Sequence, residues 1–365
     1  MLISNNLETS AWNCFPEKKS NNKYAVFFVV TDNYSFATAN VIMGLKQYSS
    51  ELLNSCDILI YHNGISDKHK QLLSTLHDNI IFSEFVLPFS WAIMESHRTP
   101  AQWGSIVLCK FLGIELVKIY EKVLLLDADM LIRGDISPLF DVEEDIAWRK
   151  VISWNPNQYF ASLLRNPNDS ISVCNAGLIL FTNKINKYNI DNNSILQAYE
   201  LTKDIERGGI DETLLAWLVY SNEMSVKELD VEIYNTPARD ITPNTKIVHF
   251  LIYKSILTKP WKNLAAYLFF NDWVENYRRW LAIGGEDVID FEQQDYYKLF
   301  AYDKEKEIAD LKKQVKKLKN SRISKLEQEL KQIKSSTSWK ITKPLRQLAK
   351  IFRTLKKKVK SCFRK

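Results

Sequence analysis

Lys122-Val123-Leu124-Leu125-Leu126-Asp127-Ala128-Asp129 is the stretch of sequence that decides the fold. Its apolar run has branched side chains and no polar alternation, which is typical of a parallel strand buried on both faces. Ligands of open α/β sheets bind at the carboxyl ends of such strands, and carboxylate oxygens are suited to hard divalent cations. The stretch therefore predicts a metal that holds a diphosphate at a sheet edge. The alternative is a solvated turn or a helix N-cap, which Asp also favours.

Candidate strands and helices alternate on both sides of this stretch. Apolar runs at 24–30, 56–61, 80–85, 176–181 and 246–250 are predicted strands. Helical spacing or composition marks 35–48, 66–76, 105–120, 211–220 and 261–281. This order predicts an α/β fold with a mostly parallel sheet between flanking helices.

Charge is divided unevenly along the chain of 365 residues, 46% of which are hydrophobic. Residues 1–303 contain 27 Lys and Arg against 38 Asp and Glu, whereas residues 304–365 contain 22 against 5. The length allows one large domain with an appendage. We therefore expect the basic tail, and not the acidic body, to meet a polyanionic surface.

Five segments are predicted from these patterns. They are a polar segment over 1–22, the main α/β domain over 23–285, a linker over 286–303, a coiled-coil helix over 304–334 and a basic amphipathic helix over 335–365.

The predicted coiled coil rests on apolar residues three or four positions apart. Ile308, Leu311, Val315 and Leu318 begin the pattern, which resumes at Ile323 after a phase slip at 320–321. Such spacing indicates a coiled coil that could form a homo-oligomer, and a lone charged helix is the alternative.

The predicted basic helix has an apolar stripe at Leu345, Leu348, Phe352, Leu355 and Val359. Lys and Arg fill much of the remaining surface, and a Trp lies at the edge of the stripe. This composition favours a helix that lies on an anionic membrane surface. Nucleic acid is not an expected partner, because the body has no recognised motif for it and phosphates would not use the stripe.

The five cysteines favour a reducing compartment. Cys14, Cys56, Cys109, Cys174 and Cys362 form no CxxC pair, and an odd count argues against a disulfide framework. The sequence has neither a signal-peptide pattern at its start nor a window of about 20 apolar residues. We expect a cytoplasmic protein that is peripherally associated with the inner face of a membrane.

Several other motifs lie before and after Asp127 and Asp129 in the sequence. They are Thr31-Asp32-Asn33-Tyr34, Lys110, LLLDADMLIRGDISPLF (124–140), Asn175-Ala176-Gly177, Asp211-Glu212, KIVHF (246–250) and Lys259-Pro260-Trp261. Together, over roughly residues 24–281, they resemble the family 8 retaining glycosyltransferases, which include glycogenin and bacterial lipopolysaccharide galactosyltransferases. The resemblance implies a GT-A type fold, a UDP-sugar donor such as UDP-glucose or UDP-galactose, and bound Mn²⁺ or, as a poorer fit, Mg²⁺.

The resemblance also implies a role for each motif. Asp127, Asp129 and His249 would hold the metal, and Asp211 and Glu212 would be catalytic. The donor nucleotide would be bound by Thr31, Asp32, Asn33, Tyr34, Lys110, Ala128 and Lys259, with Tyr34 stacked on the uracil. The donor sugar would be bound by Asn175, Ala176, Gly177 and Asp211.

Three departures from the family pattern leave alternatives open. Thr31 stands where members usually have an acid. Glu212 stands where they have Gln, so it would stabilise or attack the anomeric centre, or only bind the sugar. The interval from His249 to Lys259 is four residues longer than usual and lacks a Gly, so Lys254 could compete with Lys259 for the phosphate.

The sequence thus predicts a hexosyltransferase that acts on a cell-surface glycan or its lipid-linked precursor. Residues 336–346 (STSWKITKPLR) favour this acceptor class, because they resemble a tail segment of bacterial surface-polysaccharide glycosyltransferases. A sugar nucleotidyltransferase is one alternative, although it would normally have a Gly-rich basic loop after the first strand. A catalytically silent scaffold that acts through the coiled coil and the tail is the other.

Overall fold

The computed structural model describes residues 21–151, 155–251, 258–289, 291 and 293–347. The chain forms two compact units, Met1–Glu292 and Gln293–Lys365. We describe each unit by itself.

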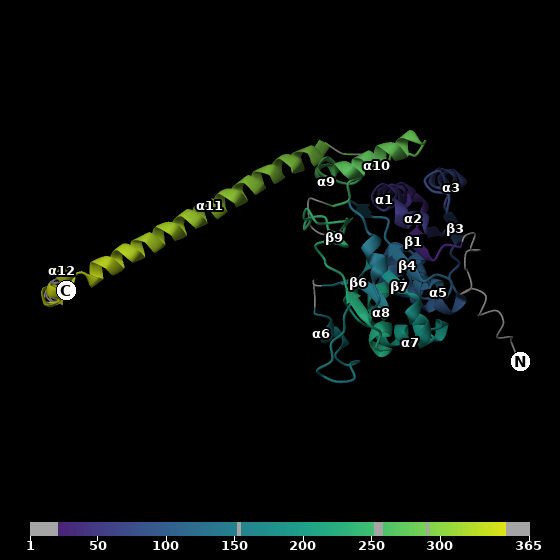
Figure 1. Cartoon of the computed structure of the whole chain (residues 1–365), viewed down its shortest axis with the longest axis horizontal. Helices are drawn as coiled ribbons and strands as arrows, with labels where there is room; N and C mark the ends of the chain where they lie inside the picture. The colour runs from purple at the N-terminus through teal and green to yellow at the C-terminus, as the bar shows by residue number, and fades with distance from the viewer. Residues whose placement is uncertain (1–20, 152–154, 252–257, 290, 292, 348–365) are drawn as a thin grey trace, which may run out of the picture. The chain divides into compact units, whose positions relative to one another are not determined.

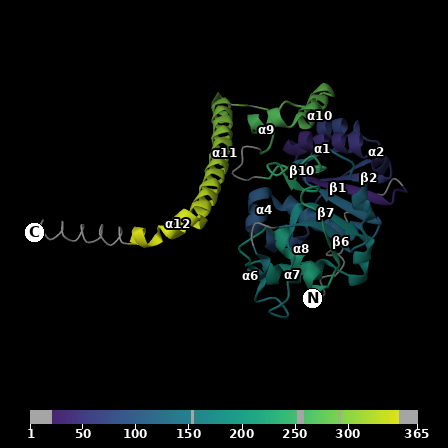
Figure 2. The same cartoon turned by 60° about the vertical axis from the view of Figure 1, so that its left-hand side comes forward.

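The larger unit is built on a seven-stranded sheet with the order β3-β2-β1-β4-β7-β6-β8 (Figures 1 and 2). The strands are β1 (Tyr24–Val30), β2 (Cys56–His62), β3 (Ile80–Glu84), β4 (Lys122–Leu126), β6 (Ile146–Lys150), β7 (Cys174–Thr182) and β8 (Val226–Glu228). Strands β1 to β4 run parallel, and β7 runs antiparallel to both of its neighbours. The predicted α/β fold with a mostly parallel sheet is confirmed.

Alternating side chains of the sheet feed two hydrophobic cores. In β1, Val26 and Phe28 face one core, whereas Ala25 and Phe27 face the other. Helices α1 (Ser35–Tyr48), α2 (Ser50–Asn54), α3 (Asp67–Ser74) and α10 (Asn271–Ala282) cover the first face, and α5 (Leu112–Leu116), α7 (Asn192–Thr202) and α8 (Ile210–Ser221) cover the second (Figure 1). Burial on both faces explains why the strand sequences show no polar alternation.

A small second sheet has the order β5-β10-β9. Its strands are β5 (Met130–Ile132), β9 (Thr236–Pro237) and β10 (Ile247–His249). His249 pairs with Met130 on one side and with Pro237 on the other. This sheet therefore joins the chain that follows β4 to segments more than 100 residues later in the sequence.

The helix predicted over 105–120 is broken in the structure. A 3₁₀ helix, η3 (Ser105–Phe111), precedes the short α5. Ile106 and Val107 are β-branched, which lowers the preference of this segment for a regular α-helix. Strands β5, β6, β8 and β9 and the helices α4 (Arg98–Trp103), α6 (Pro156–Phe160) and α7 were not predicted.

The smaller unit contains α11 (Gln293–Ser335) and α12 (Thr337–Ile341). Helix α11 begins within the segment expected as a linker and continues through the phase slip without a break. In and after α12, the guanidinium of Arg346 stacks over the ring of Trp339, 3.6 Å from its centroid. The stripe residues Leu348, Phe352, Leu355 and Val359 lie outside the described residues. None of the helices in the described part of the chain has the length and apolar character that a bilayer crossing requires.

Candidate active site

Two carboxylates lie in the short connection between β4 and β5. The backbone N–H of Asp127 donates to the carbonyl of Gly177 at 2.8 Å, which fixes the turn against β7. The carbonyl of Asp129 accepts from the N–H of Phe250 at 2.9 Å, which extends the pairing of β5 with β10. Both acids are therefore held by the backbone of neighbouring strands.

His249 approaches these acids from β10. Its Nε2 lies 3.2 Å from Asp129 Oδ1 and 4.0 Å from Asp127 Oδ2. One ligand atom from each of the three residues lies within 4.8 Å of the others. Two carboxylate oxygens and one imidazole nitrogen at this separation fit a divalent cation such as Mn²⁺ or Mg²⁺.

The imidazole is oriented by Asn235, which precedes β9. His249 Nδ1 lies 2.8 Å from Asn235 Oδ1 and 3.2 Å from Asn175 Oδ1. With its proton on Nδ1, the ring donates to these amide oxygens and leaves the lone pair of Nε2 on the side of Asp127 and Asp129, where it could bind a cation together with the carboxylates. Asn235 is fully buried and has a φ of 55°, a left-handed conformation that Asn tolerates better than most residues.

Gly177 leaves room for the imidazole. A Cβ at this position would lie 2.3 Å from His249 Cε1 and 2.8 Å from Nδ1. Strand β7 thus lies so close to β10 that a side chain cannot be accommodated without moving the ring. This contact gives a structural reason for the glycine in the Asn175-Ala176-Gly177 motif.

Lys110, at the end of η3, connects the acids of β4 to those of α8. Its Nζ lies 2.9 Å from Asp127 Oδ1 and 3.2 Å from Asp211 Oδ2, and it donates to the carbonyl of Ala176 at 3.1 Å. Burial opposes the charge of this lysine, but the carboxylates of Asp127 and Asp211 outweigh burial and raise its pKa well above the ordinary value. Lys110 is therefore a fixed positive charge in the site.

Asp211 and Glu212 lie in the first turn of α8. Glu212 Oε2 accepts from the N–H of Gly209 at 3.1 Å, and its Oε1 lies 3.4 Å from Asn175 Nδ2. Burial, followed by the negative charge of Asp211, raises the pKa of Glu212 to about 7. A carboxyl with this pKa is partly protonated near neutral pH and can donate a hydrogen bond.

Lys259 contacts the second acid of the cluster formed by Asp127, Asp129 and His249. Its Nζ is 2.7 Å from Asp129 Oδ2 and donates to the hydroxyl of Tyr34 at 3.2 Å. Burial disfavours the charge, but Asp129 outweighs it and the pKa of Lys259 is raised. Lys254, the alternative phosphate ligand, lies outside the described residues.

These groups line one cleft with a volume of about 1040 Å³. The predicted site residues along it are Thr31, Asn33, Tyr34, Lys110, Asp127, Ala128, Asp129, Asn175, Ala176, Gly177, Asp211, Glu212, His249 and Lys259. Asp32 is the exception: its carboxylate accepts from the N–H and hydroxyl of Ser66 and contacts His69 Nδ1 at 2.7 Å, so it supports the start of α3.

Sequence reasoning missed Asn235, which lies behind His249, and several residues that line the cleft. Asn235 orients His249, and its only sequence signal is an Asn in the turn-like stretch before Pro237. Arg98, Gln102, Trp103 and Arg207 also line the cleft, and 48% of Trp103 is exposed. The guanidinium of Arg98 donates to the carbonyls of Glu206 and Gly208, which ties α4 to the segment before α8.

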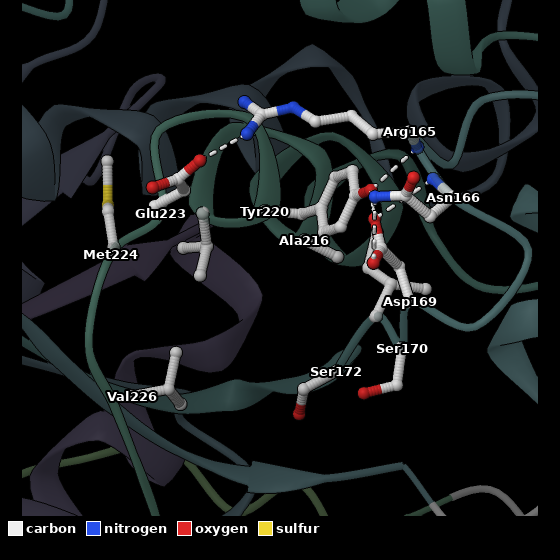
Figure 3. Close-up of a pocket in the computed structure, with 12 residues that line it drawn as sticks. Arg165, Asn166, Asp169, Ser170, Ser172, Ala216, Tyr220, Glu223, Met224 and Val226 are labelled. Carbon is white, nitrogen blue, oxygen red and sulfur yellow. Dashed lines mark hydrogen bonds and ion pairs between the residues drawn. The ribbon is translucent and has the colours of Figure 1, made fainter.

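A smaller hollow of about 450 Å³ lies beside the end of α8 (Figure 3). Its polar groups bind one another: Arg165 forms an ion pair with Glu223, and the hydroxyl of Tyr220 donates to Asp169 at 2.5 Å. The predicted site residues are not among those that line this hollow. Its carboxylates therefore serve as controls for those of the cleft.

Solved structures of other proteins share the fold of the larger part of this chain. The galactosyltransferase LgtC, in complex with donor and acceptor sugar analogs, is similar with 17% identity and a TM-score of 0.55, over 71% of this chain and 99% of that one. An active-site variant of LgtC with glutamate in place of glutamine is similar with 18% identity and a TM-score of 0.54, over 70% and 95% of the two chains.

The WbbM bifunctional glycosyltransferase is similar with 19% identity and a TM-score of 0.52, over 74% of this chain and 52% of that one, so the chain spans about half the length of WbbM. No curated protein matches the sequence. The family described as Glycosyl transferase family 8 matches residues 25–265. This chain belongs to glycosyl transferase family 8.

Proposed function

We propose that this protein is a metal-dependent retaining glycosyltransferase that transfers a hexose, glucose or galactose, from a UDP-sugar to a cell-surface glycan or its lipid-linked precursor. One observation carries the proposal: the carboxylates of Asp127 and Asp129 and the imidazole of His249 converge in a cleft. Membership of a glycosyltransferase family supports sugar transfer over nucleotidyl transfer.

The charges of the cleft suit a diphosphate leaving group. Cleavage of the anomeric bond increases the negative charge on the diphosphate, and a bound Mn²⁺ or Mg²⁺ would stabilise that charge as a Lewis acid. Lys259, beside Asp129, supplies a second positive group that acts most strongly when the charge is largest. Thr31, Asn33 and Tyr34 lie on this side of the cleft and would bind the uracil and ribose.

The donor sugar would lie between the metal and α8. Lys110 holds the carboxylate of Asp211 near that of Asp127, so Asp211 can accept hydrogen bonds from sugar hydroxyls at a fixed position. Beyond it, Arg98, Gln102 and Trp103 offer polar groups and an exposed aromatic face. This combination supports an acceptor sugar on that side, because an amphipathic ring can pack against a sugar face while polar groups bind its hydroxyls.

A panel of UDP-sugars with Mn²⁺ tests the proposal through the release of free sugar. We expect slow hydrolysis of UDP-glucose or UDP-galactose, and Asp129→Asn should reduce it by at least about a hundredfold because a metal ligand is lost. Asp169→Asn, which removes a carboxylate from the smaller hollow, should leave the rate unchanged. If the protein binds no UDP in the presence of Mn²⁺, the result would instead favour the catalytically silent scaffold. Release of pyrophosphate from UTP and a sugar phosphate would favour a nucleotidyltransferase.

Gly177→Ala provides a test of the metal site that does not depend on turnover. The added Cβ would meet the imidazole of His249, so we expect the affinity for Mn²⁺, measured by calorimetry, to fall by about 10 to 100-fold. The control is Gly134→Ala, whose Cβ would meet only the flexible Lys246 side chain at 3.0 Å. Equal Mn²⁺ affinities for the two variants would contradict the role of His249 as a ligand.

Glu212 would act as a neutral hydrogen-bond donor near the anomeric carbon. Its carboxyl stands where the family usually has an amide, and a protonated carboxyl resembles an amide in shape and in its ability to donate. The raised pKa supports this form, because burial and the charge of Asp211 both favour the protonated carboxyl. The nucleophile interpretation needs the opposite, ionised form.

Glu212→Gln distinguishes these two roles. For the wild type, hydrolysis should slow as the pH rises through about 7, because the raised pKa means that the donor form is present below this pH and is lost above it. The variant should keep the rate of the protonated wild type within about threefold and lose this pH dependence. A loss of about a hundredfold at every pH would instead identify Glu212 as a nucleophile.

The basic tail would hold the enzyme on an anionic membrane, where a lipid-linked acceptor is found. Deletion of residues 339–365 should release the protein from vesicles that contain phosphatidylglycerol, because each Lys or Arg near such a surface contributes about 1 kcal/mol of binding free energy. The deletion should leave donor hydrolysis intact. Replacement of Lys356, Lys357 and Lys358 by Gln should weaken vesicle binding without shortening the chain. Loss of hydrolysis on deletion would mean that the tail is part of the fold.

A further inference from the structure

Helix α11 carries a continuous stripe of exposed apolar side chains. The stripe consists of Leu311, Val315, Leu318, Ile323, Leu326, Leu330 and Ile333, each of which keeps between 46% and 71% of its surface exposed. Most positions between them are charged. An apolar stripe of this length is a feature of helices that pair with another helix.

We infer that α11 pairs with α11 of a second copy of this chain, in a parallel, in-register, two-stranded coiled coil. At 43 residues, α11 is about 64 Å long, which provides several heptads for pairing. Its stripe residues follow the three-four spacing of heptad positions a and d in two blocks, Leu311 to Leu318 and Ile323 to Ile333, which are separated by the phase slip.

The phase slip favours a second copy over an unrelated helix. The interval from Leu318 to Ile323 is five residues, whereas a regular heptad would have four. A partner has to shift its own seam at the same level in order to keep apolar side chains opposite each other. A second copy of α11 in register meets this condition by symmetry.

The residue types in the middle of the seam favour two parallel strands. Val315 and Ile323 occupy a positions, and Leu318 and Leu326 occupy d positions, whereas the last pair, Leu330 at a and Ile333 at d, has the opposite order. β-Branched residues at a together with Leu at d pack best in parallel dimers.

The flanking charges favour the same orientation. In a parallel, in-register pair, Arg322 faces Glu327 of the second copy, and Glu329 faces Lys334 of the second copy. Each of these opposite-charge pairs occurs twice, and the corresponding pair in the first half, Gln314 with Lys319, is not repulsive. An antiparallel pair would bring Lys319 close to its own copy at the centre of the coil.

Sedimentation of the full chain tests the pairing. We expect twice the chain mass of 42.6 kDa, and the Leu318→Asp/Leu326→Asp variant should sediment at 42.6 kDa.

Charge reversal tests the pairs that flank the seam. Arg322→Glu should weaken the dimer by about tenfold, because the new carboxylate would repel Glu327 of the second copy. The double variant Arg322→Glu/Glu327→Lys should restore the affinity of the dimer. The control is Lys316→Glu, which makes the same charge change at an outward-facing b position and should leave that affinity unchanged. A wild type of 42.6 kDa overturns the inference.

Cysteine cross-linking tests the orientation. In a Cys14→Ser/Cys362→Ser background, Val315→Cys and Leu326→Cys should each form disulfide-linked dimers, because each residue faces its own copy. Lys317→Cys, which faces away from the seam, should not. Cross-linking only in a mixture of the Val315→Cys and Leu326→Cys chains would overturn the parallel orientation, since antiparallel helices bring these two positions together.

Donor hydrolysis by the same variants separates this inference from the proposed enzyme activity. The stripe lies outside the unit that contains the cleft, so the monomeric variant should hydrolyse the donor at the wild-type rate. A dimer without hydrolysis refutes the enzyme activity alone. Hydrolysis by a wild-type chain that sediments as a monomer refutes the pairing alone.

Discussion

The pairing of β10 with β5 is the constraint on which the candidate site depends. Asp127 and Asp129 come directly after β4, but His249 comes 120 residues after Asp129 in the sequence, and only the register between Met130 and His249 brings them together. The same small sheet places Asn235, just before β9, against the other nitrogen of the ring. Two acids after a strand would otherwise be an ordinary turn. The three-stranded sheet turns them into a set of ligands with a fixed imidazole.

Electrostatic balance is the second constraint on this cleft. Besides Glu206, four carboxyl groups line it, those of Asp127, Asp129, Asp211 and Glu212, and like charges so close together would repel strongly in a partly buried site. Lys110 and Lys259 compensate three of them through ion pairs of 2.7 to 3.2 Å, and the fourth, Glu212, has a raised pKa because burial and Asp211 disfavour its charge. A divalent cation and a diphosphate bring opposite charges together, so their binding disturbs this balance less than either one alone.

The sequence predicted the central strands well because their signal is local. β1 and β4 are buried on both faces and read as uninterrupted apolar runs, and their predicted bounds agree with the structure. The short β5 and β9 have no such signal, because two or three residues become a strand only when a partner lies beside them. For the same reason Asn235 could not be predicted: its role depends on the tertiary contact with His249. Asp32 shows another tertiary contact that the motif does not indicate, since its carboxylate binds Ser66 and His69 at the start of α3.

A parallel pair of α11 helices would change how the tail binds a surface. Each basic segment follows the C-terminal end of its own α11, so a parallel pair brings both segments to the same end of the coil, whereas an antiparallel pair would separate them by the length of the coil. A single lipid chain gives only marginal, reversible membrane binding, and stable attachment takes a second signal such as a polybasic patch; two basic segments at one end of the coil would act in the same way. Once one segment has bound, the other is held at high effective concentration near the same membrane. Dimerisation through the stripe would therefore convert two weak membrane contacts into one durable attachment without any change in the catalytic cleft.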